Sequence, residues 1–176
     1  MRITGGVLSG WAYPNGFASH VRPSTDRVRE SLFNLINHRW PIEGKHVLDL
    51  FSGSGIIAGE FLSYGADCVI SVDRDFKNIQ YQKEVKLKSE AFENWYIHKR
   101  NVFAHISSNA DTFDFIFADP PYDLPNIQSL PGLLVPHLKE GGLVILEHAP
   151  QLVFPIEGIL KKEYGSTTIT IFASND

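Results

Sequence analysis

Phe113-Asp-Phe-Ile-Phe-Ala-Asp-Pro-Pro-Tyr122 combines a strand-forming segment with an abrupt stop. The segment up to Ala118 is almost entirely apolar or aromatic, as expected of a strand buried on both faces of a sheet. Neither proline after Asp119 has an N–H group, so the ladder of hydrogen bonds cannot continue. We therefore expect the chain to leave the sheet here, with a carboxylate and unpaired carbonyl groups at the strand end.

The residues at this strand end suit one kind of ligand. Asp119 and the Pro120 carbonyl can accept hydrogen bonds from an exocyclic amine, and the ring of Tyr122 can stack on a planar group. The alternative is a strand followed by an ordinary proline turn, with Tyr122 used for packing. These four residues by themselves leave both interpretations open.

A second apolar strand, residues 46–51, leads into Ser52-Gly53-Ser54-Gly55 and then into a helical pattern from Ile56. Strand, glycine loop and helix begin a βαβ unit, in which a ligand can approach the glycine backbone and the free N–H groups of the helix. No Gly-Lys-Ser/Thr follows, so the loop is not a phosphate-binding P-loop. A dinucleotide-dependent oxidoreductase could use these glycines with Asp73, but it leaves residues 119–122 without a role.

Apolar runs alternate with helical patterns along the chain and end in a hairpin. This order predicts an α/β fold with a doubly wound, mostly parallel sheet and an antiparallel C-terminal edge hairpin. The carboxyl ends of parallel strands meet at one edge, so the fold gathers their terminal polar residues in one cleft. The expected strands are residues 46–51, 68–73, 95–98, 113–118, 143–147, 160–164 and 167–172, and the gathered residues are Asp49, Asp73, Asn101 and Asp119.

Asp73 ends the strand that follows the glycine loop. An acid at this position commonly accepts hydrogen bonds from the two hydroxyls of a ribose. It could instead cap the next helix, although Asp75 is also placed for that role.

The N-terminal part of the chain is more basic than the rest. Residues 1–45 carry six basic and three acidic side chains, although the formal net charge of the protein is −4. A short arm precedes a helix expected to start after a cap at Ser24 or Thr25 and to run to about His38, and Arg22, Arg27 and Arg29 cluster at its start. Cations oppose the dipole at a helix N-terminus, so a bound phosphate would explain them, as would a solvated basic face.

The composition indicates one globular domain of 176 residues. No apolar run approaches the roughly 20 residues of a membrane span, and the N-terminus lacks the apolar core of a signal peptide. Cys68 is the single cysteine, which excludes an internal disulfide. The histidines show no ligand spacing, so we expect no metal site, and we expect a cytoplasmic monomer.

Three motifs together resemble the S-adenosylmethionine-dependent amino-methyltransferases: Val47-Leu-Asp-Leu-Phe-Ser-Gly-Ser-Gly55, Asp73, and Asp119-Pro-Pro-Tyr122. Arg2-Ile-Thr-Gly-Gly6 and Arg22-Pro-Ser-Thr-Asp-Arg-Val-Arg-Glu-Ser-Leu-Phe-Asn34 are similar to one branch, the bacterial 16S ribosomal RNA guanine-N2 methyltransferases. The first group of motifs specifies only the class, whereas the arginine block is far more specific. The resemblance covers residues 2–172.

One position departs from that family. Gly10 is followed by Trp11, where the family usually has an arginine, so one expected phosphate contact is missing.

The resemblance implies a Rossmann-like, seven-stranded class I methyltransferase fold, with residues 1–40 as an RNA-contacting arm and helix and residues 41–176 as the methyltransferase domain. It implies methyl transfer from S-adenosylmethionine to the exocyclic N2 of a guanine in 16S ribosomal RNA, within a 30S subunit or an assembly intermediate, with S-adenosylhomocysteine as the product. Another RNA, DNA or protein acceptor is the alternative, and a non-catalytic RNA-binding assembly module is a further one.

The resemblance also implies three sets of site residues and no metal. The catalytic set is Asp119, Pro120, Pro121 and Tyr122. The cofactor set is Asp49, Phe51, Gly53, Gly55, Asp73, Arg74, Asn101, Val102 and Asp119. The RNA-binding set is Arg2, Arg22, Thr25, Arg27 and Arg29.

Overall fold

The structure, a computed structural model, describes residues 1–17 and 25–174. Its strands form one seven-stranded sheet in the order β3-β2-β1-β4-β5-β7-β6. The predicted fold class is confirmed, including the hairpin at the C-terminal edge. The strands are β1 (His46–Leu50), β2 (Cys68–Asp73), β3 (Trp95–Lys99), β4 (Phe113–Ala118), β5 (Leu138–His148), β6 (Leu160–Tyr164) and β7 (Thr167–Ala173).

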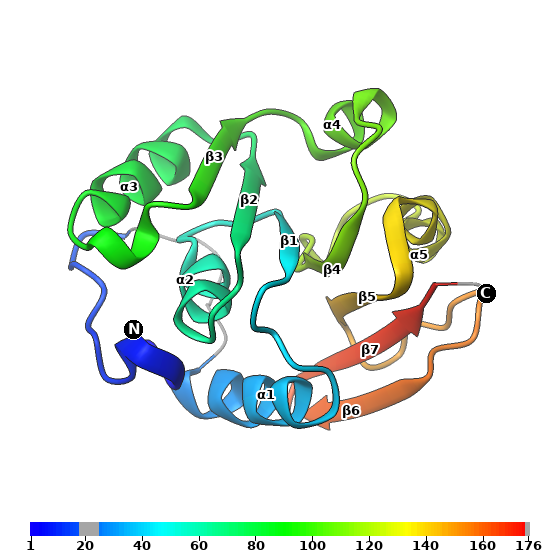
Figure 1. The fold of residues 1–176 in the computed structure, drawn as a ribbon. Helices are drawn as coiled ribbons and strands as arrows, with labels where there is room; N and C mark the ends of the chain where they lie inside the picture. The colour runs from blue at the N-terminus through cyan, green and yellow to red at the C-terminus, as the bar shows by residue number, and fades with distance from the viewer. Residues whose placement is uncertain (18–24, 175–176) are drawn as a thin grey trace.

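The direction of the strands changes at one place. Strands β1 to β5 pair in parallel, whereas β7 pairs antiparallel with both β5 and β6. Strand β7 therefore lies inside the sheet and β6 forms its edge (Figure 1). The central strands β1 and β4 are buried on both faces, which explains their nearly continuous apolar sequences.

Helices cover both faces of the sheet (Figure 1). Buried residues of α1, α2 and α3 share one core cluster, and those of α4 and α5 share the other. No helix within the described ranges is long and apolar enough to cross a membrane. The helices are α1 (Asp26–Arg39), α2 (Ile56–Ser63), α3 (Phe76–Lys86), α4 (Val102–Ser108) and α5 (Leu130–Leu134), with 3-10 turns at Gly6–Leu8, Glu90–Phe92, Ile127–Ser129 and Val135–His137.

Side-chain caps determine where the helices near the strand ends begin. The Thr25 hydroxyl accepts from the Val28 N–H at 3.3 Å and starts α1. The Asp75 carboxylate accepts from two backbone N–H groups and starts α3. Asp75 is therefore the cap of α3, the role that Asp73 could have taken, and the Asp73 carboxylate does not cap this helix.

The N-terminal arm packs against α2. Ile3 is buried, and its N–H donates to the Trp11 carbonyl at 3.0 Å, which folds the arm back on itself. The Ser63 hydroxyl of α2 donates to the Gly5 carbonyl and accepts from the Leu8 N–H. The arm is thus part of the packed structure.

We expect Gly55→Ala to lower the free energy of unfolding by about 1–3 kcal/mol more than Gly44→Ala. The two glycines have nearly the same left-handed backbone, with φ of 75° and 73°. A methyl group at Gly55 would lie 2.3 Å from Cζ2 of Trp95, whereas a methyl group at Gly44 would meet no atom within 4 Å. Urea unfolding of both variants tests this, and equal losses would show that Trp95 moves aside at little cost.

Candidate active site

Three acidic side chains lie together at the carboxyl ends of adjacent strands. Asp49 is in β1, Asp119 follows β4 directly, and Glu147 is near the end of β5. Asp49 and Glu147 have exposed fractions of 1% and 6%. The alternation of side chains along a strand places all three on the face of the sheet that α2 covers.

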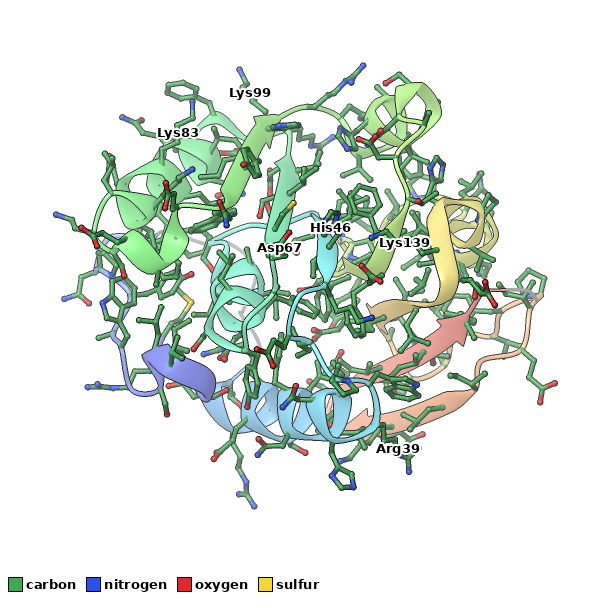
Figure 2. All side chains as sticks on the ribbon, in the orientation of Figure 1. Arg39, His46, Asp67, Lys83, Lys99 and Lys139 are labelled. Carbon is green, nitrogen blue, oxygen red and sulfur yellow. The ribbon has the colours of Figure 1, made fainter. Side chains whose placement is uncertain are left out.

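No described cation forms an ion pair with any of these three carboxyls. The ion pairs of the sheet gather instead at the opposite ends of the strands, where Lys139 pairs with Asp114 at 2.9 Å and His46 lies 3.3 Å from Asp67. Figure 2 shows His46, Asp67 and Lys139 near one another. Ion pairs are therefore found at one edge of the sheet, whereas the three carboxyls at the other edge form none with a described residue.

Burial raises the pKa of each carboxyl in this group. For Asp49 the pKa rises from 3.8 to about 8, with the nearby Asp73 adding to the effect of burial and a hydrogen bond from Ser71 opposing it. Burial also raises the pKa of Asp119 well above its usual range, and the charges of Glu147 and Asp49 add to this. The pKa of Glu147 is raised by burial and partly restored by the hydrogen bond from Thr167. Such a site favours a ligand that brings cationic or hydrogen-bond-donating groups.

The glycine loop and Asp73 form the second part of the site. Oδ2 of Asp73 accepts from the Gly53 N–H at 2.8 Å and from the Asn78 amide at 3.2 Å, and Oδ1 accepts from the Asp75 N–H. These donors hold the carboxylate in a fixed position beside the loop. A methyl group at Gly53 would come no closer than 3.9 Å to another atom, so a ligand could approach the backbone there.

Gly55 and Phe51, the other two predicted cofactor residues around this loop, differ from Gly53 in their surroundings. Trp95 covers the Cα of Gly55, and the Tyr13 hydroxyl donates to the Gly55 carbonyl at 2.9 Å, so Gly55 is required for packing. Phe51, at the end of β1, has a left-handed backbone with φ of 56°. A non-glycine residue in this conformation stores local strain, as is common at functional sites.

The remaining predicted cofactor residues follow strands β2 and β3. The side-chain oxygen of Asn101 accepts from the Ala104 N–H at 3.1 Å and so caps α4. Its side-chain NH₂ group makes no hydrogen bond to a described residue and can donate to a ligand. Val102 is buried beside it, and Arg74 is exposed after β2. All three lie at the same edge of the sheet as Asp49 and Asp73.

The four residues after β4 have unequal environments. Pro120 is buried, and its carbonyl accepts no hydrogen bond from a described residue. The Pro121 carbonyl already accepts from the Leu124 N–H at 3.0 Å. Tyr122 is 59% exposed, which argues against a packing role and leaves its ring available to stack on a ligand.

The prediction that Arg29 lies at an RNA-binding surface is wrong, because its side chain is fully buried. Its guanidinium donates to Glu60 at 3.3 Å and to the Arg2 carbonyl at 2.8 Å, and it pairs with Asp26. The helical spacing of Arg29 with the buried residues Leu32, Phe33 and Ile36 places it on the buried stripe of α1. It joins the arm, α1 and α2 inside the protein.

The other predicted RNA contacts differ in accessibility. Arg27 and Arg2 are exposed, and one guanidinium nitrogen of Arg2 donates to the Gly10 carbonyl at 3.1 Å. The Thr25 hydroxyl is used as the α1 cap, and Arg22 lies outside the described residues.

Trp11, where the resemblance led us to expect an arginine, belongs to an aromatic cluster. It packs edge-on against Tyr13 and Phe92, at centroid distances of 5.4 and 5.2 Å. Its role is therefore packing of the arm.

Two features of the site were not predicted. Sequence reasoning identified Glu147 only as the end of a strand, although an acid that closes an apolar run is the same signal that identified Asp119. The partnership of Arg29 with Glu60 had no local signal. Within residues 1–17 and 25–174, no group of three His, Cys, Asp or Glu side chains could hold a metal ion.

Comparison with known proteins gives consistent matches over the whole chain. The family model described as Conserved hypothetical protein 95 matches residues 1–173. "Putative rRNA methyltransferase YlbH" of Bacillus subtilis (strain 168) is 33% identical over 182 residues, which cover 98% of each chain. "Ribosomal RNA small subunit methyltransferase D" of Haemophilus influenzae is 30% identical over 171 residues, covering 93% of this chain and 87% of that protein. The solved structure of "Putative methyltransferase yhhF from Escherichia coli" superposes with a TM-score of 0.83 at 26% identity, covering 99% of this chain and 97% of that one.

We expect Arg29→Met to destabilise the protein by about 3–5 kcal/mol, because it leaves Glu60 buried without its cationic partner. Arg27→Met, two residues away and exposed, should change stability by less than about 0.5 kcal/mol. Urea unfolding measures both. Similar small changes for the two variants would mean that Glu60 does not depend on Arg29.

We expect the stability of the ligand-free protein to fall as pH rises from about 4 to 8. The folded-state pKa of Asp49 exceeds its ordinary value, so the folded state keeps a proton that the unfolded chain loses, and this stabilisation disappears as pH passes about 8. Asp49→Asn should reduce the loss of unfolding free energy between pH 5 and pH 8 by a few kcal/mol, the order of magnitude that proton linkage allows. Unfolding free energies at pH 5 and pH 8 test this, with the exposed Asp111→Asn as a control that should keep the wild-type slope.

Proposed function

The chain belongs to the family described as Conserved hypothetical protein 95, which its match over residues 1–173 shows, and we propose that it methylates the exocyclic N2 amine of a guanine in 16S ribosomal RNA. The methyl donor in this proposal is S-adenosylmethionine. The names of the relatives from Bacillus subtilis and Haemophilus influenzae support a ribosomal RNA acceptor. The observation that carries the proposal is the Asp119 carboxyl and the neighbouring Pro120 carbonyl, neither of which has a partner among residues 1–17 and 25–174, beside the exposed ring of Tyr122.

The glycine loop and Asp73 suit the cofactor. The backbone at Gly53 is open to a ligand, and the three donors that hold Asp73 leave it able to accept from ribose hydroxyls. Asn101 and Val102 at the end of β3 offer an amide and an apolar surface to the adenine. Bound there, S-adenosylmethionine supplies a methyl group on a positively charged sulfur.

The residues after β4 would prepare the amine for attack. Its lone pair is delocalised into the purine ring, so the free amine is a poor nucleophile. Asp119 and the Pro120 carbonyl would accept from its two N–H bonds, orient the lone pair and stabilise the positive charge that develops on nitrogen. Tyr122 would stack on the base, which must leave its own stack to enter the site. Most of the rate enhancement then comes from positioning.

Recognition of the RNA would involve the N-terminal part of the protein. Arg2 and Arg27 are exposed near the start of α1 and could contact phosphates. Arg29 is internal, and the net charge is −4, so the electrostatic attraction to naked RNA is limited. A 30S subunit or an assembly intermediate, whose shape adds to recognition, is therefore the proposed substrate.

We expect the purified protein to transfer labelled methyl groups to 30S subunits from a strain that lacks its own guanine-N2 enzyme. Digestion of the RNA should give labelled N2-methylguanosine. Asp119→Ala should reduce the rate by about 10²–10³-fold, because it removes an acceptor that acts on developing charge, while cofactor binding persists. Asp123→Asn, an exposed acid in the same loop, should behave as wild type.

Each other outcome identifies a different error. Label in another nucleoside, in DNA or in protein would show that the proposed acceptor is wrong and that the protein is still a methyltransferase. RNA binding without cofactor binding would show that the protein is a non-catalytic assembly module and not an enzyme.

A further inference from the structure

Glu147 is an acidic residue of the site that the proposed reaction does not use. Ala118 of β4 pairs in register with Leu146 of β5, so the residues that follow them, Asp119 and Glu147, lie side by side. Adjacent strands are about 4.8 Å apart, which brings the two carboxyls near enough to contact one small ligand together. Burial raises the pKa of Asp119 and the charge of Glu147 adds to this, in agreement with their proximity.

The hydrogen bonding of Glu147 is incomplete. Oε1 accepts from the Thr167 hydroxyl at 3.0 Å. Among the described residues, no group donates to Oε2 and no cation pairs with the carboxylate, although the side chain is only 6% exposed. Oε2 is therefore an acceptor that has no described donor, and it can accept a hydrogen bond from a ligand.

The strand order places Glu147 on the acceptor side of the site. The glycine loop follows β1 and Asp73 ends β2, whereas β5 lies on the other side of β4. Asp119 therefore stands between the proposed cofactor site and Glu147. A hydrogen-bond donor that reaches Oε2 of Glu147 would therefore belong to the acceptor molecule that contacts Asp119, and not to the cofactor.

We propose that Glu147 determines specificity for guanine by accepting a hydrogen bond from N1–H of the base whose N2 amine contacts Asp119. This inference rests on the proposed guanine-N2 activity. The carbon that bears the amine is bonded to two ring nitrogens, of which N1 carries a hydrogen and N3 is an acceptor. A carboxylate attracts the first and repels the second, so Glu147 would also set the orientation of the base.

The same contact would reject bases that lack this donor. Adenine places an unprotonated N1 beside its amine, and 2-aminopurine has the same N2 amine as guanine with an unprotonated N1. A buried carboxylate facing either N1 is left without a hydrogen bond and meets a lone pair. Discrimination of this kind is worth about 1–3 kcal/mol, or roughly 5- to 150-fold in rate.

The test compares acceptors that differ at N1. After the labelling experiment has located the modified guanine, 30S subunits are reconstituted with 16S RNA that carries guanine, 6-thioguanine or 2-aminopurine at that position. Wild-type protein should methylate guanine and 6-thioguanine, which both have N1–H, at least about 5-fold faster than 2-aminopurine. Glu147→Gln should slow guanine methylation and lose or reverse this preference, because the Gln amide can donate to an unprotonated N1. Glu140→Gln, an exposed site on the same strand, should keep the wild-type preference.

The possible failures are distinguishable. Wild-type protein that methylates guanine and 2-aminopurine equally overturns the role of Glu147 without any need for a variant. A Glu147→Gln protein that binds cofactor and slows all three acceptors by one factor also overturns it, since that is a structural effect. Absence of methylation of the guanine substrate by wild type overturns the proposed function itself.

Discussion

The end of β4 at Ala118 is the constraint on which the site depends. Because Pro120 and Pro121 cannot donate hydrogen bonds, the ladder of β4 stops at Ala118, and Asp119 pairs with no residue of the neighbouring strands β1 and β5. The in-register ends of the neighbouring strands then place Asp49 and Glu147 on the same face. Burial and mutual repulsion raise the pKa of Asp119 and leave a site whose electrostatics a donor-rich ligand improves.

The fold compensates for this arrangement elsewhere. Lys139 and His46 pair with acids at the opposite ends of the strands, where no ligand is expected. The left-handed backbone of Phe51 and the carboxyls that form no ion pair with a described residue both occur at the carboxyl edge. Unfavourable local features are thus concentrated at the edge where ligand binding can offset them. At the other edge the acidic side chains have partners within the protein.

The ion pair of Arg29 with Glu60 connects the N-terminal arm to the domain. Glu60 also accepts from the Thr4 N–H, so one buried carboxylate is shared by the arm and α1. Part of the basic character of residues 1–45 is therefore internal and structural. This reduces the positive surface available for RNA and favours, in our proposal, a substrate recognised by shape as well as by charge.

The sequence by itself determined where most strands lie, because apolar runs bounded by glycine and proline allow few alternatives, but β5 begins at Leu138 and runs through the glycines at which a turn was expected before residue 143. Residues 113–118 and 68–73 were predicted with the bounds that the structure has, and the common direction of parallel strands placed Asp49, Asp73 and Asp119 at one edge. The tertiary structure alone decided which charged groups are internal and which face the site. Arg29 finds Glu60 31 residues away, and Glu147 joins the site because β5 lies beside β4. Local patterns report the environment of a residue along its own helix or strand, whereas its partner depends on how separate elements pack.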